Sequence, residues 1–452
     1  MNSQVTKPYR GREKISEIAP AGGTGSLRRR CRGVSGGLKR FIKVLGPGLI
    51  TGASDDDPSG ISTYAIAGAS FGFATLWMAL VTLPMMAAVQ YMCAKIGMVS
   101  GRGLAGVLKT YYPGKLLYIT VFSLVIANSI NAGADIGAIA AGINLLIPIP
   151  VWSLIAPIAL AVIALQIWGS YRLIANIFKW LTLALFAYVL SAFLCKPSLG
   201  DVMRGTFVPS FPWNRAFIAL TVGILGTSIS PYMFFWQSNQ EVEEEIAAGR
   251  KTLAQRKGAT DAELKYAAWD VNLGMLLSNT VMYFIILSTA ATLFKAGKTE
   301  IQSAADAAQA LRPLAGRAAE TLLALGLIGT GFLAVPILTG SSAYAVAEAF
   351  GWKHGFNKRP ERAKEFYWLI VVSTLLGMMI NFAGINPIKA LFLTAVLNGF
   401  LAPPMLFLIM KVSNNRKIMG ARVNGLVLNL AGWVTAAVMS AAAIGLIITW
   451  RQ

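Results

Sequence analysis

The stretch Asp55-Asp56-Asp57-Pro58-Ser59-Gly60 interrupts the first long apolar run of the chain, which covers residues 44 to 69. A charged side chain inside such a run costs about 3 kcal/mol unless it faces a wet cavity or a partner. Pro58 removes a backbone donor and glycines flank it, so we expect residues 52 to 60 to be unwound. Bare carbonyls and carboxylates at an unwound stretch suit a cation. The alternative, aspartates that only cap a helix at a membrane surface, fits poorly with the apolar residues on both sides.

The composition indicates a chain that lies mostly in lipid. Its 452 residues are 55% hydrophobic and 13% charged, and the mean hydropathy is +0.59, which leaves too little polar surface for a soluble domain. About 20 apolar residues span a bilayer as a helix, and the runs lack the short alternating pattern of barrel strands. We therefore predict an all-α polytopic membrane protein. Eleven spans are expected, near residues 44–69, 73–98, 116–146, 151–168, 174–195, 216–240, 270–294, 318–350, 366–383, 388–410 and 424–450.

The basic residues indicate how the spans are oriented. With a cytoplasmic N-terminus, 31 of the 40 Lys and Arg residues fall on the cytoplasmic side, as the positive-inside rule requires. The net charge of +20 therefore reflects membrane orientation rather than nucleic-acid binding. We expect a bacterial-type cytoplasmic (inner) membrane, an external C-terminus, a disordered basic tail over residues 1–43 and an ordinary solvated cytoplasmic loop over residues 241–268.

A second break is expected at Leu225-Gly226-Thr227-Ser228-Ile229-Ser230-Pro231-Tyr232, where a glycine, hydroxyl side chains and a proline interrupt the sixth span. Pro58 and Pro231 each lie near the middle of the first helix of a five-helix set. Paired interruptions of this kind indicate an inverted-repeat transporter with a site at the midplane, although two unrelated proline kinks would give the same pattern. The expected domains are residues 44–195 for the first repeat, 216–410 for the second and 424–450 for an eleventh helix.

The two motifs resemble those of the Nramp family of divalent-metal transporters, and the resemblance extends across essentially all the spans. Gly46-Pro47-Gly48-Leu49-Ile50 followed by Asp57-Pro58-Ser59-Gly60 is similar to the family's Gly-Pro-Gly lead and Asp-Pro-Gly-Asn motif. Residues 225–232 take the place of the sixth-helix stretch that ends in Met-Pro-His. The resemblance implies a LeuT-type fold of five plus five helices, with a metal site between helices 1 and 6.

Departures from the family pattern bear on the ion. Asp57 matches the family's metal-binding aspartate, but Gly60 stands in place of the asparagine ligand and Ser230 in place of the methionine ligand. Without a soft thioether, the hydroxyl, carbonyl and carboxylate oxygens that remain suit Mg²⁺ and tolerate Mn²⁺. The resemblance agrees, because a Nramp-related branch of magnesium transporters has altered first and sixth helix motifs. The residues expected to bind the metal are Asp57, Ser54, Gly60, Thr227 and Ser230.

The groups that would carry protons are also altered. Tyr232 stands in place of the histidine of Met-Pro-His, and the sole histidine, His354, falls in a basic loop. The ninth span carries no charge from Phe366 to Phe382. Because proton relays need titrating groups, we expect uptake without proton coupling. The membrane potential alone is worth about 4.6 kcal/mol for a divalent ion at 100 mV.

Further polar residues are candidates for a vestibule or for support of the ligands. Asn128, Asn131 and Asp135 share one face of the third span by their spacing. Asp135 is open to three interpretations: a residual proton acceptor, a partner of the metal ligands, or a buried polar contact. Asp55 and Asp56 either attract cations or cap the half-helix that follows. The remaining candidates are Tyr232, Gln237 and Asn398.

Rival functions fit the sequence less well. A membrane-embedded, Mg²⁺-dependent prenyltransferase needs a second acidic cluster with phosphate-binding cations, and the carboxylate of an amino-acid substrate would be repelled by the aspartates. The nearest rival is a proton-coupled Mn²⁺ or Fe²⁺ symporter of the main Nramp type. We therefore expect a transporter rather than an enzyme, with no catalytic residues, cofactor or obligate protein partner. Its partners are the lipid bilayer and a divalent ion, Mg²⁺ or Mn²⁺, as substrate.

Overall fold

The computed structural model describes residues 46–169 and 183–450, and the regular elements within these ranges are all helical. Nine helical segments there are long and apolar enough to cross a membrane. The first expected span is present as two shorter helices, and of the fifth only η2 (Leu183–Phe186) and α10 (Ala187–Leu194) are described. The predicted polytopic helical architecture is therefore confirmed. The predicted tail over residues 1–43 lies outside the described residues.

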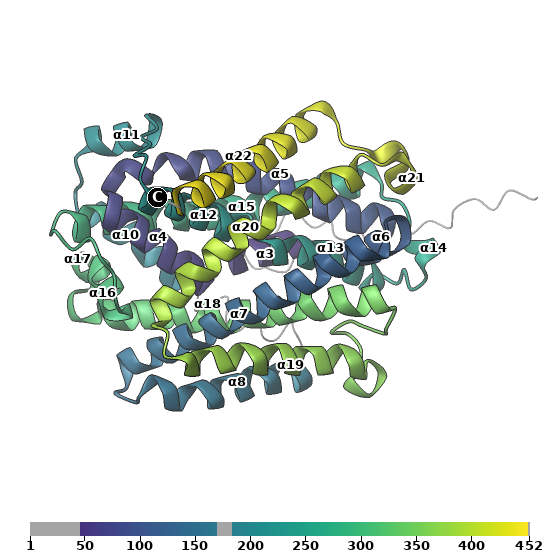
Figure 1. Cartoon of the computed structure of the whole chain (residues 1–452), viewed down its shortest axis with the longest axis horizontal. Coiled ribbons are helices and arrows are strands. Elements are labelled where there is room, and N and C mark those ends of the chain that lie inside the picture. Colours follow the sequence, from purple (N-terminus) through teal and green to yellow (C-terminus); the bar gives the residue numbers. More distant parts are fainter. Residues whose placement is uncertain (1–45, 170–182, 451–452) are drawn as a thin grey trace, which may run out of the picture. The chain divides into compact units, whose positions relative to one another are not determined.

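The spanning helices follow the predicted order closely. They are α5 (Trp77–Ser100), α7 (Gly114–Leu146), α8 (Val151–Trp168), α12 (Arg215–Ser228) with α13 (Pro231–Ala247), α15 (Asp261–Thr289), α18 (Ala319–Phe350), α19 (Lys364–Ile380), α20 (Pro387–Ser413) and α22 (Leu426–Trp450). Shorter helices connect them, among them α6 (Leu104–Tyr111), α11 (Leu199–Phe207), α14 (Leu253–Arg256), α16 (Ala304–Ala308), α17 (Arg312–Ala315) and α21 (Arg416–Met419). Figure 1 shows α7 and α18 side by side, with α8 and α19 next to them.

Burial separates the inner helices from those that face lipid. In the apolar stretch of Arg215–Ala247, 94% of the residues are buried, against 33% in α8, α19 and α22. Large apolar side chains on the outer helices are exposed, as for Trp168 at 81% and Leu426 at 85%. A bilayer would cover this surface, which is far too apolar for water. The sixth span is therefore at the centre of the bundle, where a transport site needs to be.

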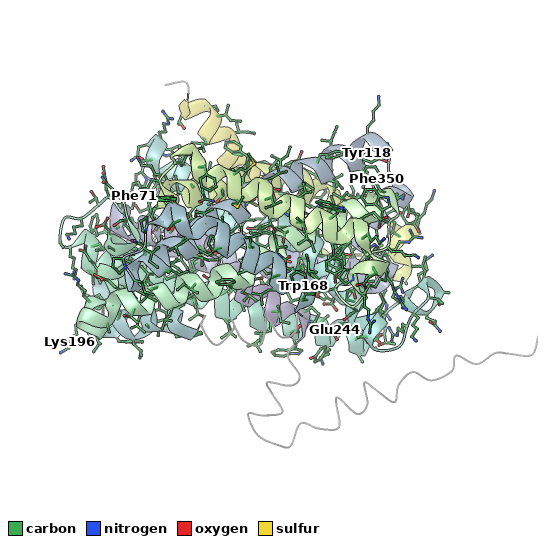
Figure 2. All side chains as sticks on the ribbon, turned by 90° about the horizontal axis from the view of Figure 1, so that it is seen from below. Phe71, Tyr118, Trp168, Lys196, Glu244 and Phe350 are labelled. Carbon is green, nitrogen blue, oxygen red and sulfur yellow. The ribbon has the colours of Figure 1, made fainter. Side chains whose placement is uncertain are left out.

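Labelled side chains show how the spans alternate in direction. Phe71 and Lys196 lie toward one end of the molecule in Figure 2, while Tyr118, Phe350 and Glu244 lie toward the other. The rings of Tyr118, at the start of α7, and Phe350, at the end of α18, are 5.6 Å apart. The two helices are thus antiparallel neighbours, and their opposite directions fit spans three and eight of the predicted order.

The first span breaks at only two residues. Its first half, α3 (Pro47–Asp55), ends before Asp56, and its second half, α4 (Pro58–Phe71), begins directly after Asp57. The prediction that residues 52–60 unwind was wrong in extent, because glycine is tolerated within α3 and Pro58 occupies the first helical position of α4. Proline fits that position, since its missing N–H would have no helical partner there.

The second break is equally short. Helix α12 continues through Ser228, and α13 starts at Pro231, which leaves Ile229 and Ser230 between them. The prediction of unwinding over residues 225–232 was therefore also too wide. In both spans a proline opens the second half-helix, so the two breaks have the same local construction.

Close backbone contact holds the first half-helix against α15. A Cβ atom built on Gly52 would lie 2.3 Å from the carbonyl oxygen of Gly274, and one on Gly48 would lie 2.6 Å from the amide nitrogen of Val271. Asp270, on the same helix, accepts hydrogen bonds from the Gly46 amide at 3.1 Å and the Gly48 amide at 2.7 Å. Only residues without a side chain allow helices to approach so closely.

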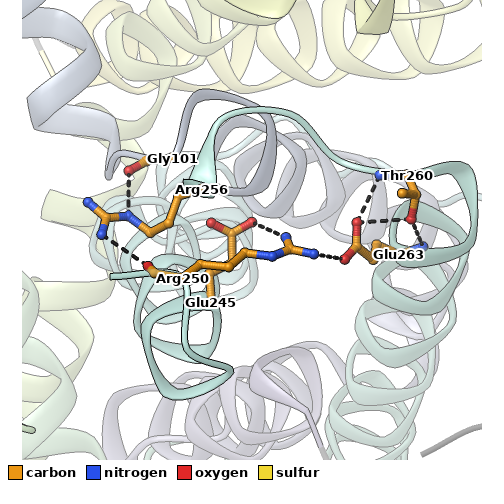
Figure 3. Close-up of polar contacts among 6 residues, drawn as sticks. All are labelled: Gly101, Glu245, Arg250, Arg256, Thr260 and Glu263. Carbon is orange, nitrogen blue, oxygen red and sulfur yellow. Dashed lines mark hydrogen bonds and ion pairs between the residues drawn. The ribbon is translucent and has the colours of Figure 1, made fainter. Parts of the chain in front are cut away.

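The connection between α13 and α15 differs from the expected solvated loop over residues 241–268. Helix α13 extends to Ala247, and Glu241 and Glu245 are only 6% and 7% exposed. Arg250 forms ion pairs with Glu245 and Glu263, and Arg256 donates to the carbonyl of Gly101 (Figure 3). The expectation of a solvated loop was wrong in extent, because residues 241–247 belong to α13 and include buried glutamates, whereas most of residues 248–262 are exposed.

Gly52→Ala should lower the stability of the folded protein, because the new methyl group meets the backbone of Gly274 rather than a movable side chain. Overpacking of this kind costs about 1–3 kcal/mol. Thermal unfolding in detergent should show a lower midpoint for this variant. Gly425→Ala is the matched control, since no atom lies within 4 Å of a Cβ built there. Equal midpoints for the two variants would contradict the packing described for α3.

Candidate functional site

Asp57 sits in the first break and caps the half-helix that follows. Its Oδ1 accepts hydrogen bonds from the Ser59 hydroxyl at 2.6 Å and the Gly60 amide at 2.8 Å. Its Oδ2 accepts from the side-chain amide of Asn131, on α7, at 3.2 Å. The residue is 2% exposed. An ionised carboxylate offers about four acceptor positions, so three donors still leave Asp57 able to bind a cation.

Tyrosine side chains place the two breaks beside each other. The Tyr232 hydroxyl, just after the second break, donates to the carbonyl of Ser54, just before the first, at 3.2 Å. On the other side, the Tyr64 hydroxyl lies 3.3 Å from the Ser228 hydroxyl and accepts from Thr227 at 3.3 Å. These contacts join α3 to α13 and α4 to α12. The residues of both breaks are thereby brought to one place.

The hydroxyls of two predicted ligands, Ser230 and Ser54, donate their protons to backbone carbonyls. The Ser230 hydroxyl lies 2.7 Å from the carbonyl oxygens of both Gly226 and Thr227, and the Ser54 hydroxyl donates to the backbone carbonyl of Thr51 at 2.8 Å. A hydroxyl oxygen that donates its proton keeps two lone pairs for a cation. In the described residues, no three His, Cys, Asp or Glu side chains converge on a metal position. An ion at the breaks would therefore need hydroxyl, amide and carbonyl oxygens or water besides a carboxylate.

Asp55 and Asp56 are turned toward a helix that the sequence did not single out. Both carboxylates lie against the Ser278 hydroxyl of α15, at 2.5 Å from Asp55 Oδ2 and 3.2 Å from Asp56 Oδ1. Asp55 is 1% and Asp56 5% exposed. Asp57 is instead bonded to α7. The three consecutive aspartates therefore divide between two helices, and only one of them faces the polar residues of the third span.

The polar stripe of α7 divides in a similar way. Asn131 bonds to Asp57, whereas the Asn128 amide donates to α18, to the Leu338 carbonyl at 3.1 Å and to Ser341 at 2.9 Å. Asp135 is fully buried, neither of its carboxylate oxygens has a hydrogen-bond partner, and it lies within electrostatic reach of Asp57. Asn131 thus lies at the first break, Asn128 faces α18, and Asp135 is buried without a hydrogen-bond partner.

The other candidates lie farther along the same helices. Gln237 accepts from Thr51 of α3 at 2.6 Å and donates to Glu241 at 2.9 Å, so it ties α3 to α13. Asn398, on α20, is 2% exposed and its amide nitrogen has no partner. Helix α20 packs against both α4 and α12. His354 lies in the connection after α18, where its Nδ1 is 2.9 Å from the Trp352 carbonyl.

Sequence reasoning missed Tyr64 and Ser278. Each lies among other polar residues of a membrane helix, Tyr64 after Ser62 and Thr63 and Ser278 before Asn279, so neither stands out in the sequence. Tyr64 follows Asp57 by seven residues, which places the two on one face of α4, and this spacing could have drawn attention to it. Ser278 carries no such signal, because its partners belong to a different span.

Comparison with solved structures defines the class. The manganese transporter of Eremococcus coleocola, in complex with an aromatic bis-isothiourea substituted compound, has a similar structure, with a TM-score of 0.72 and 18% identity over 90% of this chain and 87% of that chain. Mhp1, a nucleobase-cation-symport-1 family transporter, is similar with a TM-score of 0.55 and 15% identity over 90% of this chain and 92% of that chain. The fold is that of a LeuT-type membrane transporter, as predicted.

Residues 48–449 match the family described as natural resistance-associated macrophage protein-like, and the chain belongs to this family, Nramp. It is 27% identical over 425 residues to the divalent metal cation transporter MntH of Bacillus subtilis (strain 168), covering 91% of this chain and 93% of the relative. The predicted family is confirmed. The expectation of a multi-pass membrane transporter rather than an enzyme is also confirmed. Such a transporter acts without a cofactor or an obligate partner protein. The prenyltransferase alternative is wrong.

Asn131→Ala should weaken divalent-ion uptake, because the Asp57 carboxylate would lose the donor that orients its Oδ2. Loss of a residue that orients a metal ligand typically lowers affinity about 10-fold or more. The apparent KM for ion uptake into proteoliposomes measures the effect. Asn144→Ala is the control on the same helix, since Asn144 bonds the Ile149 carbonyl near the helix end. An unchanged KM for Asn131→Ala would remove Asn131 from the site.

Proposed function

We propose that this protein takes up Mg²⁺, and tolerates Mn²⁺, across the bacterial cytoplasmic membrane by alternating access. The observation that carries the proposal is the Asp57 carboxylate, which is buried in the first break beside the second. It accepts hydrogen bonds from the Ser59 hydroxyl and from the Gly60 and Asn131 amides. A carboxylate with neutral oxygens and retained water is the usual arrangement for Mg²⁺ in proteins. The transported ion is the substrate, and the binding residues proposed are Asp57, Ser54, Gly60, Thr227 and Ser230.

The proposal for Mg²⁺ rests on which ligands are absent from the motif positions. Ser230 occupies the position of the family's thioether, and Gly60 has no side chain where an amide ligand would be. The thioether of Met282 accepts weak hydrogen bonds from Ser228 at 3.7 Å and Thr82 at 3.9 Å, so it is engaged with other groups. Hard oxygen ligands without sulfur favour Mg²⁺ over the softer transition metals.

The proposal of uptake without protons rests on the groups that a relay would use. Tyr232 replaces the histidine after the second break, and its hydroxyl is bonded to the Ser54 carbonyl. Helix α19 carries no charged residue after Glu365. The membrane potential suffices as the driving force at about 2.3 kcal/mol per charge per 100 mV.

The proposed orientation keeps the N-terminus in the cytoplasm and the C-terminus outside. The proposed repeats cover residues 44–195 and 216–410, and an eleventh helix covers residues 424–450.

The alternative is a proton-coupled Mn²⁺ or Fe²⁺ symporter of the main Nramp type. Two observations favour it. The relatives described above are a divalent metal cation transporter and a manganese transporter. Asp135 is a buried carboxylate that has no hydrogen-bond partner and lies within electrostatic reach of Asp57. Such a group could accept a proton. The two functions differ in the ion carried and in whether protons accompany it.

Asp57→Ala should abolish Mg²⁺ uptake, because it removes the carboxylate at the break together with the cap of α4. Purified protein in liposomes that contain a Mg²⁺-sensitive dye gives the measurement. Asp201→Ala is the control, since Asp201 is an exposed carboxylate in α11. Uptake by the Asp57 variant at the rate of the control would refute the proposed site.

Ser230→Met should shift the preference toward Mn²⁺, because it places a soft sulfur at the second break. The measurement is competition between Mn²⁺ and Mg²⁺ during uptake, expressed as the ratio of the two half-saturating concentrations. We expect the ratio to change about 10-fold in favour of Mn²⁺, equivalent to about 1.4 kcal/mol. Ser230→Ala, which adds no sulfur, serves as the control. The same ratio in both variants would show that the soft-ligand argument is wrong.

A further inference from the structure

The carboxylates of Asp55 and Asp56 converge on one hydroxyl. Ser278 has a single proton, so it can satisfy only one of the two oxygens that it contacts, at 2.5 Å and 3.2 Å. Asp55 Oδ1 has no hydrogen-bond partner, although the residue is 1% exposed. Asp57, by comparison, receives three hydrogen bonds. Asp55 and Asp56 therefore form the less satisfied part of the aspartate triplet.

Nothing in the described part of the chain neutralises this pair. The ion pairs found there join Arg250 to Glu245 and Glu263, and Arg422 to Asp261, all near the connections between helices. Helix α3 ends at Asp55, so its negative end points toward the pair and adds to the charge. Burying an unpaired carboxylate is unfavourable by several times the energy of a hydrogen bond. The pair therefore needs a proton or a cation to offset its charge.

Buried carboxylates are concentrated at the first break. Four carboxylates are buried around the first break, those of Asp55, Asp56, Asp57 and Asp135. Asp57 receives three hydrogen bonds, whereas Asp55 has one oxygen without a partner and Asp135 has two.

We propose that Asp55, Asp56 and Ser278 form a second divalent-cation site, between the end of α3 and α15, distinct from the site at Asp57. The inference rests on the proposed function, since it requires that divalent ions reach the break. The second site has two carboxylates and a hydroxyl, a hard ligand set that suits Mg²⁺ or Mn²⁺. The ion in this site offsets the charge of the pair, and the ion at Asp57 is the one that is transported.

The test counts bound ions in the purified full-length protein, with Mn²⁺ as the probe and its free concentration read by electron paramagnetic resonance. The wild type should bind two Mn²⁺ per chain, both displaced by Mg²⁺. Asp57→Asn should bind one, and the double variant Asp55→Asn with Asp56→Asn should also bind one. The wild type binding a single ion, or the double variant still binding two, would overturn the proposal.

Ser278→Ala is a milder variant, because it keeps all the carboxylates and removes only the hydroxyl oxygen. It should weaken one of the two Mn²⁺ affinities about 10-fold and leave the other unchanged. Ser440→Ala is the control, because the Ser440 hydroxyl donates to Ala436 of its own helix, α22. Equal affinities in the two serine variants would contradict the role of Ser278.

Transport measured on the same samples separates the two claims. A wild type that binds one ion and still takes up Mg²⁺ would refute the second site and leave the proposed function intact. A wild type that binds two Mn²⁺ but moves no Mg²⁺ would refute the proposed function and support the second site.

Discussion

Four carboxylates buried around a two-residue break in a membrane helix impose the main constraint on this structure. Lipid offers them no hydrogen bonds, so each must find a donor or a cation within the protein. Asp57 has donors from its own half-helix and from Asn131, Asp55 and Asp56 share Ser278, and Asp135 has none. The unequal distribution of donors is what makes the break suited to positive ions.

Helix α15 is the element that holds the first half-helix in place. At the start of α3, Asp270 accepts the amides of Gly46 and Gly48, and at its end Ser278 contacts Asp55. Between these points the helices touch through Gly52 and Gly274 without intervening side chains. The position of the aspartates therefore depends on α15 as much as on the first span. Any motion of α3 that opens a path for an ion would have to release these contacts.

Much of the fold follows from the sequence, because apolar length and proline position are local properties. Pro58 and Pro231 located both breaks, and the resemblance of the surrounding motifs led to the LeuT-type fold. The width of the breaks could not be predicted, since Gly52 and Gly226 lie within helices, where α15 and α20 pack directly against them. Likewise, the division of the aspartates between α7 and α15 depends on Asn131 and Ser278, whose positions are set by tertiary packing.

The central claim is that an oxygen-lined break carries Mg²⁺ down its electrochemical gradient without protons. Proteoliposomes with a Mg²⁺ dye and a pH dye inside, and an inside-negative potential set by a K⁺ gradient and valinomycin, test it most directly. We predict that Mg²⁺ influx rises with the imposed potential while the internal pH stays constant. Internal acidification that tracks Mn²⁺ entry, with no Mg²⁺ signal at any potential, would contradict the account.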